Sequence, residues 1–185
     1  MTSVSGGEPI TRIATLDAIL AAHADVLRSD FAPYRHHAYR VANLCAAGTL
    51  LEESQLEKIA IAAAFHDLGI WTDNTFDYLD PSVAVATAYL AESGRAEWTA
   101  EITAMILHHH KITPFRGRAY WLVEPFRRAD WLDVTAGFFA LGAMRRYVRA
   151  FYAIWPGIGF HKRLVQLEMG QLRAHPLNPL PMFRF

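Results

Sequence analysis

Apolar residues recur at offsets of three and four along most of this chain, the spacing that places them on one face of a helix. Glycine, proline and mixed polar residues separate these segments, and no alternating strand pattern lasts more than a few residues. The predicted helices span residues 15–27, 33–48, 54–69, 81–94, 96–108, 125–137, 138–152 and 160–173. The pattern predicts an all-α protein, a compact bundle of about seven or more helices.

Residues typical of helix starts support these boundaries. Ser54 and Glu57 have the spacing of a capping box, which predicts the start of the third helix. Asp80 followed by Pro81 suits an N-cap and a first helical turn, and Pro125 suits the first turn of a later helix. These residues satisfy or remove the backbone NH groups that a helix start leaves unpaired.

The length fits one domain, residues 1–185, whose core is large enough to fold without disulfides. Residues 1–12 are expected to form a flexible lead, because they begin with small and polar side chains. Residues 174–185 contain too many prolines for a helix. We expect an extended, proline-rich C-terminal tail that lies over the body and is held by its leucines and aromatic residues.

Charge and cysteine content narrow the class of protein. Lysine plus arginine and aspartate plus glutamate both number 18, so net charge gives no reason to expect a nucleic acid polymer as a partner. Cys45 is the single cysteine, which excludes an internal disulfide and a cysteine-rich zinc site and favours a reducing compartment. The N-terminus lacks a signal-peptide pattern, and the longest apolar stretch, residues 134–144, is too short to span a membrane. We expect a cytoplasmic protein without a membrane partner, and the sequence leaves a homodimer open.

A histidine and an aspartate stand side by side at the end of an apolar helix. His66 and Asp67 follow residues 59–65, which are all apolar, and Asp67 lies where unpaired backbone carbonyls already carry partial negative charge. A bound cation would remove this penalty, so the pair suits half of a divalent metal site. The alternative is a histidine that is satisfied within the core, beside an aspartate that caps the next turn.

Two further residues are predicted to face the same core. His37 falls on the apolar stripe of the second helix, whereas His36 points away from it. Asp130 lies four residues from an apolar residue on either side, so the helical period turns it inward, and Asp133 is the alternative one turn away. Two imidazoles and two carboxylates form a set that suits manganese, iron, cobalt, nickel or zinc better than calcium.

The order and spacing of these residues resemble the signature of the HD-domain superfamily of metal-dependent phosphohydrolases. The resemblance is carried by His37–Val41, Ala63–Gly69, Met105–Lys111 and Ala129–Asp130. It implies an all-helical core, residues 34–135, in which one divalent ion is held by His37, His66, Asp67 and Asp130. In that family the ion polarises a phosphoryl oxygen and lowers the pKa of a bound water.

The same resemblance implies roles for the histidine cluster at residues 108–110. The cluster would face the open side of the metal, with His109 and His110 favoured as the catalytic pair. Helix position alone does not decide which of the three histidines points inward, and a solvated helix end is the alternative for all three. Lys111, next in the chain, would help to bind the negative charge of the substrate.

Two loops are expected to form opposite walls of one pocket above the ion, because both leave helix ends that meet at the metal. Residues 71–80 mix aromatic and acidic side chains and are expected to form an ordered loop, whereas residues 111–118 form a basic loop. The candidate substrate-binding residues on these loops are Trp71, Asp77, Arg116 and Arg118.

The chain departs from the family pattern in two ways. Ile70 and Trp71 fill the places where some family phosphatases carry a glutamate, so the general base is assigned to Asp73, with Asp77 the other nearby carboxylate. The chain also lacks the further separated histidines of two-metal members of the family. This difference favours a single divalent ion as the cofactor, and two histidines of the cluster at residues 108–110 are the alternative ligands for a second ion.

The expected function is hydrolysis of a small phosphorylated compound or nucleotide by a metal-activated water. The basic loop favours a phosphorylated substrate over a neutral one. Four aromatic residues near the expected pocket, Trp71, Phe76, Tyr78 and Phe115, keep open a hydratase or lyase that acts on a small neutral molecule, as cyanamide hydratase does in the same superfamily. A non-catalytic protein that binds a metal or ligand with the same fold is the third alternative.

Overall fold

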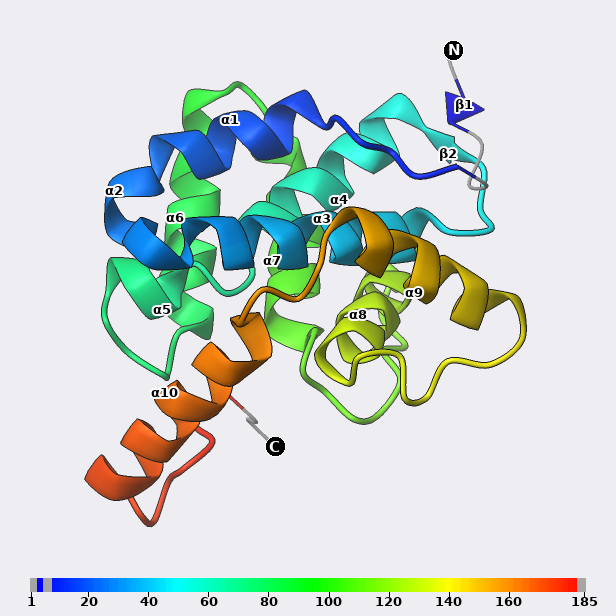
Figure 1. The fold of residues 1–185 in the computed structure, drawn as a ribbon. Helices are drawn as coiled ribbons and strands as arrows, with labels where there is room; N and C mark the ends of the chain where they lie inside the picture. Colours follow the sequence, from blue (N-terminus) through cyan, green and yellow to red (C-terminus); the bar gives the residue numbers. More distant parts are fainter. Residues whose placement is uncertain (1–2, 5–7, 183–185) are drawn as a thin grey trace.

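The computed structural model describes residues 3–4 and 8–182, and most of them lie in helices (Figure 1). The α-helices are α1 (Ala14–Ala22), α2 (Ala24–Leu27), α3 (Phe31–Ala46), α4 (Glu53–Phe65), α5 (Gly69–Thr72), α6 (Leu79–Glu92), α7 (Thr99–His108), α8 (Tyr120–Val134), α9 (Ala143–Ile154) and α10 (Phe160–Ala174). Two 3-10 helices, η1 (Arg28–Asp30) and η2 (Ala96–Trp98), and one antiparallel pair of two-residue strands, β1 (Ser3–Val4) and β2 (Leu51–Glu52), complete the described elements. The all-α prediction is confirmed.

Helices α3 and α4 form the centre of the core. Helix α3 packs against α4, α8 and α9, and α4 packs in addition against α1, α6 and α7. Because α4 has neighbours on several sides, its second half, residues 59–65, is buried all round, which explains why this stretch is uniformly apolar. The alanines of both helices allow the backbones to approach closely, and this closeness brings the ionisable residues of α3 and α4 together.

The start of α4 differs from the prediction. The capping box uses Glu52 and Gln55 instead of Ser54 and Glu57, and Gln55 Oε1 accepts the backbone NH of Glu52 at 2.9 Å. Glu57 is bound elsewhere, because its carboxylate accepts a hydrogen bond from Arg95 Nη2 at 2.6 Å. A contact with a distant residue thus decides which of two similar sequence patterns forms the cap.

Helix α8 also begins earlier than predicted. It starts at Tyr120 and encloses Pro125, which was expected in the first turn. Proline removes one helical hydrogen bond, but the preceding residues Leu122 and Val123 are buried against the core, and their burial offsets the loss. The helix ends at Val134, and α9 begins at Ala143. Residues 138–142, which were predicted to be helical, therefore belong to the connection between these two helices.

The two ends of the domain contact its body. The backbone NH of Ile10 donates to Asn43 Oδ1 at 2.8 Å, so the expected flexible lead is attached to α3 at this point, and its residues 1–2 and 5–7 lie outside the described part. Residues 175–182 form no helix or strand, as their prolines predicted. Met182 packs against Tyr78 and Leu79, whereas Leu177 is fully exposed. The last residues, 183–185, lie outside the described part.

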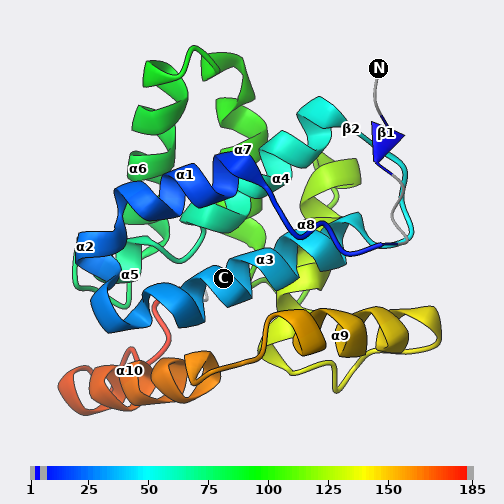
Figure 2. The ribbon, with the colours of Figure 1, turned by 45° about the horizontal axis from the view of Figure 1, so that its top comes forward.

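Helices α9 and α10 line one edge of the molecule. Figures 1 and 2 show α10 projecting from the body, and only Phe160 of this helix is buried. Both helices flank α3 on the same side in Figure 2. Among the described residues, no helix has the combination of length and apolarity that crossing a bilayer demands.

Gly69 allows α5 to pack against the start of α6. Its backbone NH donates to Ser82 Oγ at 2.9 Å, and an added Cβ would lie 2.4 Å from the carbonyl oxygen of Tyr78. This close approach holds Asp67, two residues before Gly69, near Tyr78. The position therefore requires the absence of a side chain.

We predict that Gly69→Ala lowers the free energy of unfolding by about 1–3 kcal/mol, because the new methyl group overlaps backbone atoms of α6. Gly170→Ala is the control, since nothing lies within 4 Å of a Cβ at this position of α10, and it should be neutral or stabilise by up to about 1 kcal/mol. Urea denaturation followed by circular dichroism measures both. Equal stability of the two variants would contradict this account of α5.

Candidate metal centre

Five buried side chains from four segments meet at one place in the core. They are His37 of α3, His66 and Asp67 of the turn after α4, His109 at the end of α7, and Asp130 of α8. The four helices are in mutual contact: α3 packs against α4 and α8, and α7 packs against the same two. The packing of the core thus assembles a cluster whose members are far apart in sequence.

The ligand atoms of His37, His66 and Asp130 form one close group, and Asp67 lies beside both imidazoles. His37 Nε2 lies 2.9 Å from His66 Nε2, 3.5 Å from Asp130 Oδ1 and 3.6 Å from Asp67 Oδ2. His66 Nε2 lies 3.3 Å from Asp67 Oδ2 and 3.6 Å from Asp130 Oδ1. Metal–ligand bonds of about 2.1 Å separate neighbouring ligand atoms by roughly 3.0–3.4 Å. The spacing is therefore compatible with one ion at the centre.

The tautomers of the two imidazoles strengthen this argument. His37 Nδ1 lies 2.7 Å from Asp133 Oδ2, and His66 Nδ1 lies 3.0 Å from the carbonyl oxygen of Ala63. Both partners only accept hydrogen bonds, so each Nδ1 carries the proton of the neutral ring. The two Nε2 atoms then face each other at 2.9 Å with lone pairs. Two lone pairs at this distance require a cation or an additional proton between them.

His109 repeats the arrangement of His66. Each histidine directly follows a helix, and His109 Nδ1 lies 2.7 Å from the carbonyl oxygen of Ile106, three residues earlier, as His66 Nδ1 does from Ala63. The carbonyl is one that a helix end leaves without a helical partner. His109 Nε2 therefore also carries a lone pair, and it lies 3.3 Å from Asp67 Oδ1. His109 extends the cluster toward a group of three possible ligands with His66 and Asp67.

Several polar atoms of the cluster have no hydrogen-bond partner within the described part of the chain. They are Asp67 Oδ1, His109 Nε2 and Asp130 Oδ1, and all three are buried. Buried carboxylates are costly unless a cation or donor compensates them. The unpaired atoms therefore fit a bound cation better than a purely structural core.

The carboxylates and imidazoles of the cluster shift each other's pKa values in opposite directions. Burial by itself lowers the pKa of His66, but the carboxylates of Asp67 and Asp130 outweigh burial and raise this pKa to about 10. Burial raises the pKa of Asp67, yet His66 and the other histidines outweigh it and hold this pKa well below its ordinary value. The two shifts together favour ionised carboxylates with positive charge beside them, whether a proton or a metal ion supplies that charge.

Asp133, the sequence-based alternative to Asp130, serves a different purpose. Its carboxylate accepts hydrogen bonds from His37 Nδ1 at 2.7 Å and from Arg40 Nη2 at 2.9 Å, and all three side chains are buried. Although burial raises the pKa of Asp133, the hydrogen bonds from His37 and Arg40 lower it to about 2. An ionised Asp133 orients His37 with Nε2 toward the cluster, as carboxylates that support metal-binding histidines do. Arg40 was missed; its position three residues after His37 was the available signal.

A cavity of about 370 Å³ lies next to the cluster. Asp67 and Asp130 border it on the core side, and its other walls come from the loop before α6, from α8, from α10 and from the C-terminal tail. The remaining lining residues are Phe76, Tyr78, His110, Trp131, Val134, His161, Leu164, Val165, Glu168, Leu180 and Met182. The lining is largely apolar and, among the residues that the structure describes, contains no lysine or arginine.

The basic loop does not form the predicted wall of this cavity. Lys111, Arg116 and Arg118 are absent from its lining, and both arginines are exposed. Arg127 Nη1 of α8 donates to the carbonyl oxygen of Lys111 at 2.7 Å. The first residue of the loop is therefore attached to α8. The prediction that this loop and residues 71–80 face each other across the cavity is therefore wrong.

The loop of residues 71–80 contributes to the cavity through two of the aromatic residues expected near it, but not through its carboxylates. Phe76 and Tyr78 line it, whereas Asp73 and Asp77 do not. Asp73 is exposed and accepts a hydrogen bond from the hydroxyl of Thr72 at 2.7 Å. A general base at Asp73 would need a rearrangement of this loop. The aromatic spacing of the loop was the available signal for Tyr78.

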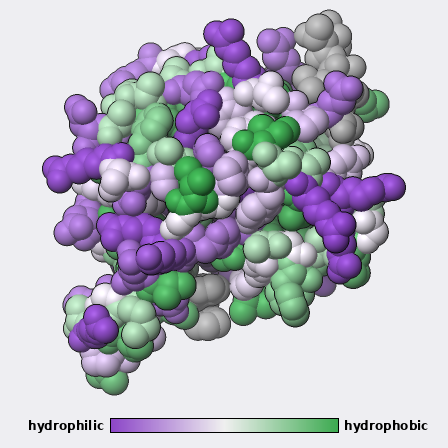
Figure 3. Space-filling view, viewed as in Figure 1, coloured by the Kyte–Doolittle hydropathy of each residue, from purple (hydrophilic) through white to green (hydrophobic). Residues whose placement is uncertain are grey.

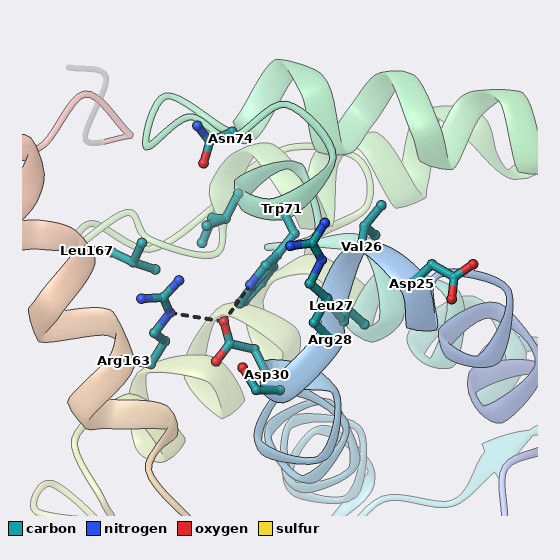
Figure 4. A pocket seen from close by; sticks show the side chains of 11 residues that line it. Asp25, Val26, Leu27, Arg28, Asp30, Trp71, Asn74, Arg163 and Leu167 are labelled. Atoms are coloured by element: carbon teal, nitrogen blue, oxygen red, sulfur yellow. Dashed lines mark hydrogen bonds and ion pairs between the residues drawn. The ribbon is translucent and has the colours of Figure 1, made fainter.

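Trp71 belongs to another cavity, of about 590 Å³, shown in Figure 4. Its indole NH donates to Asp30 Oδ2 at 2.9 Å, and Arg163 Nε donates to the same oxygen at 3.0 Å. The other charged residues of the lining are Asp25 and Arg28, so the charges around this cavity cancel. Trp71 therefore fastens α5 to η1 and α10, away from the metal-ligand cluster.

The three histidines at the end of α7 separate into three environments. His109 faces the cluster, His110 lines the cavity, and the ring of His108 lies 4.7 Å from that of Phe115. Burial and the neighbouring His109 lower the pKa of His110 to about 3, so its ring is neutral. The hydroxyl of Tyr78 hydrogen-bonds to His110 Nε2, which can accept because the ring is neutral.

Comparison with known proteins assigns no family, because no family model, no curated protein and no solved structure matches the chain.

We predict that Asp133→Ala lowers the free energy of unfolding by about 3–5 kcal/mol, because Arg40 is left buried without its carboxylate. Asp73→Ala removes an exposed carboxylate of the same type and should change stability by less than about 0.5 kcal/mol. Chemical denaturation of both variants measures the difference. A mild effect at Asp133 would show that Arg40 is compensated by other groups.

Proposed function

We propose that this chain is a metal-dependent hydrolase of the HD-domain type. One divalent ion is held by His37, His66, Asp67 and Asp130, and manganese, iron, cobalt, nickel and zinc suit this set of nitrogen and oxygen ligands. The observation that carries the proposal is the pair of imidazole Nε2 atoms 2.9 Å apart, each with its ring proton already committed at Nδ1. The resemblance of the sequence to the HD-domain superfamily supports the same ligand set.

The remaining residues have distinct tasks in this proposal. A divalent ion supplies a water of lowered pKa and polarises an electrophilic oxygen when it is bound. Asp133 keeps His37 in the ligating orientation, and the apolar walls of the cavity exclude bulk water from the reacting groups. His110 and Tyr78 form the hydrogen-bonded pair closest to the cluster in the cavity lining, and they can pass a proton between substrate and solvent.

The first substrate class is a small phosphorylated compound or nucleotide. The resemblance supports it, and Lys111, directly after His110, is the nearest basic residue along the chain that could bind a phosphate at the cavity entrance. The second class is a small neutral molecule to which water is added. One observation favours this second class: the cavity lining is mostly apolar, and within residues 3–4 and 8–182 no lysine or arginine lines it to balance a dianion.

Metal content is the primary test. We predict that the purified protein retains a divalent metal, that Asp67→Ala loses it, and that Asp133→Asn binds it roughly 10- to 100-fold more weakly, because His37 is no longer held by an ionised carboxylate. Asp73→Asn, an exposed carboxylate outside the cluster, is the matched control and should keep the metal. Elemental analysis and metal titration give the result. If the purified protein contains no metal and binds none of the five ions in titration, the proposal is wrong.

The substrate class is tested by a screen of phosphomonoesters, nucleotides and small nitriles. If the substrate is phosphorylated, inorganic phosphate should inhibit competitively, and Lys111→Ala or Arg116→Ala should lower kcat/KM by roughly ten- to a hundredfold with unchanged metal content. If the substrate is a neutral molecule, turnover should be indifferent to phosphate and to both substitutions. Metal binding without turnover of any compound would support the non-catalytic alternative.

A further inference from the structure

One segment of the chain carries only positive charge. Between Asp133 and Glu168 the sequence contains no aspartate or glutamate, but it contains Arg145, Arg146, Arg149, Lys162 and Arg163. The chain as a whole has equal numbers of acidic and basic residues. The positive charge is thus concentrated on α9 and the start of α10, at one edge of the molecule (Figure 2).

Three large apolar side chains that precede these cations in the sequence are exposed to solvent. In the connection between α8 and α9, Phe138 is 79% exposed, Phe139 is 64% exposed and Leu141 is 79% exposed. The two phenylalanine rings pack edge to face, with centroids 5.1 Å apart, and neither ring enters the core. Scattered exposed apolar residues are common, but three large ones within four positions form a patch of the kind that marks a contact surface.

Helix α9 presents its cations on the exposed face. Val148 and Phe151 are buried, whereas Arg145, Arg146 and Arg149 are exposed. Within the described residues, none of the three arginines forms a hydrogen bond or an ion pair. In Figure 3, strongly hydrophilic side chains cover the side of the molecule where α9 lies, with hydrophobic ones next to them. An exposed apolar loop therefore leads directly into an exposed and unpaired basic helix, and we treat the two together as one candidate contact surface.

We propose that this surface docks onto an anionic lipid bilayer. Phe138, Phe139 and Leu141 enter the boundary between headgroups and acyl chains, and the arginines of α9 bind the anionic headgroups. Aromatic and aliphatic side chains next to unpaired arginines match both layers of such an interface. The inference is independent of the proposed catalytic function, and it revises the expectation of no membrane partner.

A second protein copy or a nucleic acid would compensate either the apolar residues or the arginines of this surface, but not both. A second copy of this chain, related by a two-fold axis, would place the same arginines against each other with no acidic residue in the segment to compensate them. A nucleic acid would pair with the arginines, but its phosphate backbone would leave the three apolar side chains in water. An anionic bilayer covers the apolar residues and neutralises the cations at the same time.

Docking would also place the candidate metal centre near the membrane. Helix α8 carries Asp130 of the cluster and leads directly into the apolar loop, and Val134, at its end, lines the cavity. Trp131 lies between the cavity and a shallow hollow that Phe139 and Leu141 border. The apolar cavity therefore lies a short distance from the proposed membrane contact.

Vesicle flotation tests the proposal with the complete chain. Wild-type protein should float with phosphatidylcholine vesicles that contain about one-third phosphatidylglycerol, and not with phosphatidylcholine alone. Arg145→Ala/Arg146→Ala/Arg149→Ala should weaken binding by roughly a hundredfold, because each cation near an anionic surface contributes about fivefold. Phe138→Ser/Phe139→Ser/Leu141→Ser should abolish flotation at moderate salt. All of these side chains are exposed, so circular dichroism should show an unchanged fold.

Two control variants remove equal chemistry elsewhere. Arg12→Ala/Arg116→Ala/Arg118→Ala removes three other exposed arginines, and Leu50→Ser/Ile112→Ser/Leu177→Ser removes three other exposed apolar side chains. Both should float like wild type. Equal losses in test and control variants would overturn the proposal, as would flotation that ignores the phenylalanines. Sedimentation analysis covers the remaining outcome: a dimer that only the triple serine variant of the loop disrupts would assign the surface to self-association instead.

Insertion can be measured directly because Cys45, the single cysteine, is buried. Leu141→Cys labelled with an environment-sensitive fluorophore should shift its emission to the blue on anionic vesicles, since the probe leaves water for the acyl boundary. Leu50→Cys, labelled in the same way, should show no shift. An unshifted Leu141 probe on vesicles that bind the protein would refute insertion of the loop.

Discussion

Five ionisable side chains meet without enough hydrogen-bond partners at the junction of α3, α4, α7 and α8, and the rest of the fold has to hold them there. Burying charge of this kind costs several kcal/mol for each group when it is uncompensated. The apolar, alanine-rich centre of α3 and α4 provides the packing that opposes this cost. The carboxylate oxygens and imidazole nitrogens that lack a hydrogen-bond partner would be compensated by a bound cation.

The cluster is also rigid, because each imidazole is held from behind. Two histidines follow helix ends and use the free carbonyl three residues earlier to fix their tautomers, while His37 uses the carboxylate of Asp133. Asp133 is in turn held by Arg40, whose Nη1 also donates to the carbonyl oxygen of Trp155 at 2.9 Å. This chain of contacts connects the cluster to the link between α9 and α10. The geometry of the proposed ligands therefore depends on packing well outside the cluster.

The surroundings of the cluster point away from a simple phosphate pocket. The adjoining cavity has apolar walls contributed by α10 and the tail, and the basic loop lies outside it. The connection from α8 to α9, which follows the cavity-lining residue Val134, exposes three large apolar residues shortly before the unpaired arginines of α9. An apolar cavity near a surface suited to anionic lipid is consistent with a substrate that is at least partly apolar, and this differs from the substrate that the basic loop suggested.

The sequence by itself determined the helical class and the inward direction of His37, His66, Asp67 and Asp130, because helical periodicity and helix ends are local properties that neighbouring residues decide. It did not determine the capping box of α4, the start of α8 or the role of Asp133. Those depend on contacts with residues distant in the chain, such as Arg95 for Glu57 and Arg40 for Asp133. Of the cavity lining, the aromatic residues Phe76 and Tyr78 were expected near the site from the sequence. Helix α10 and Met182 reach the cavity only through tertiary packing, which no local period encodes.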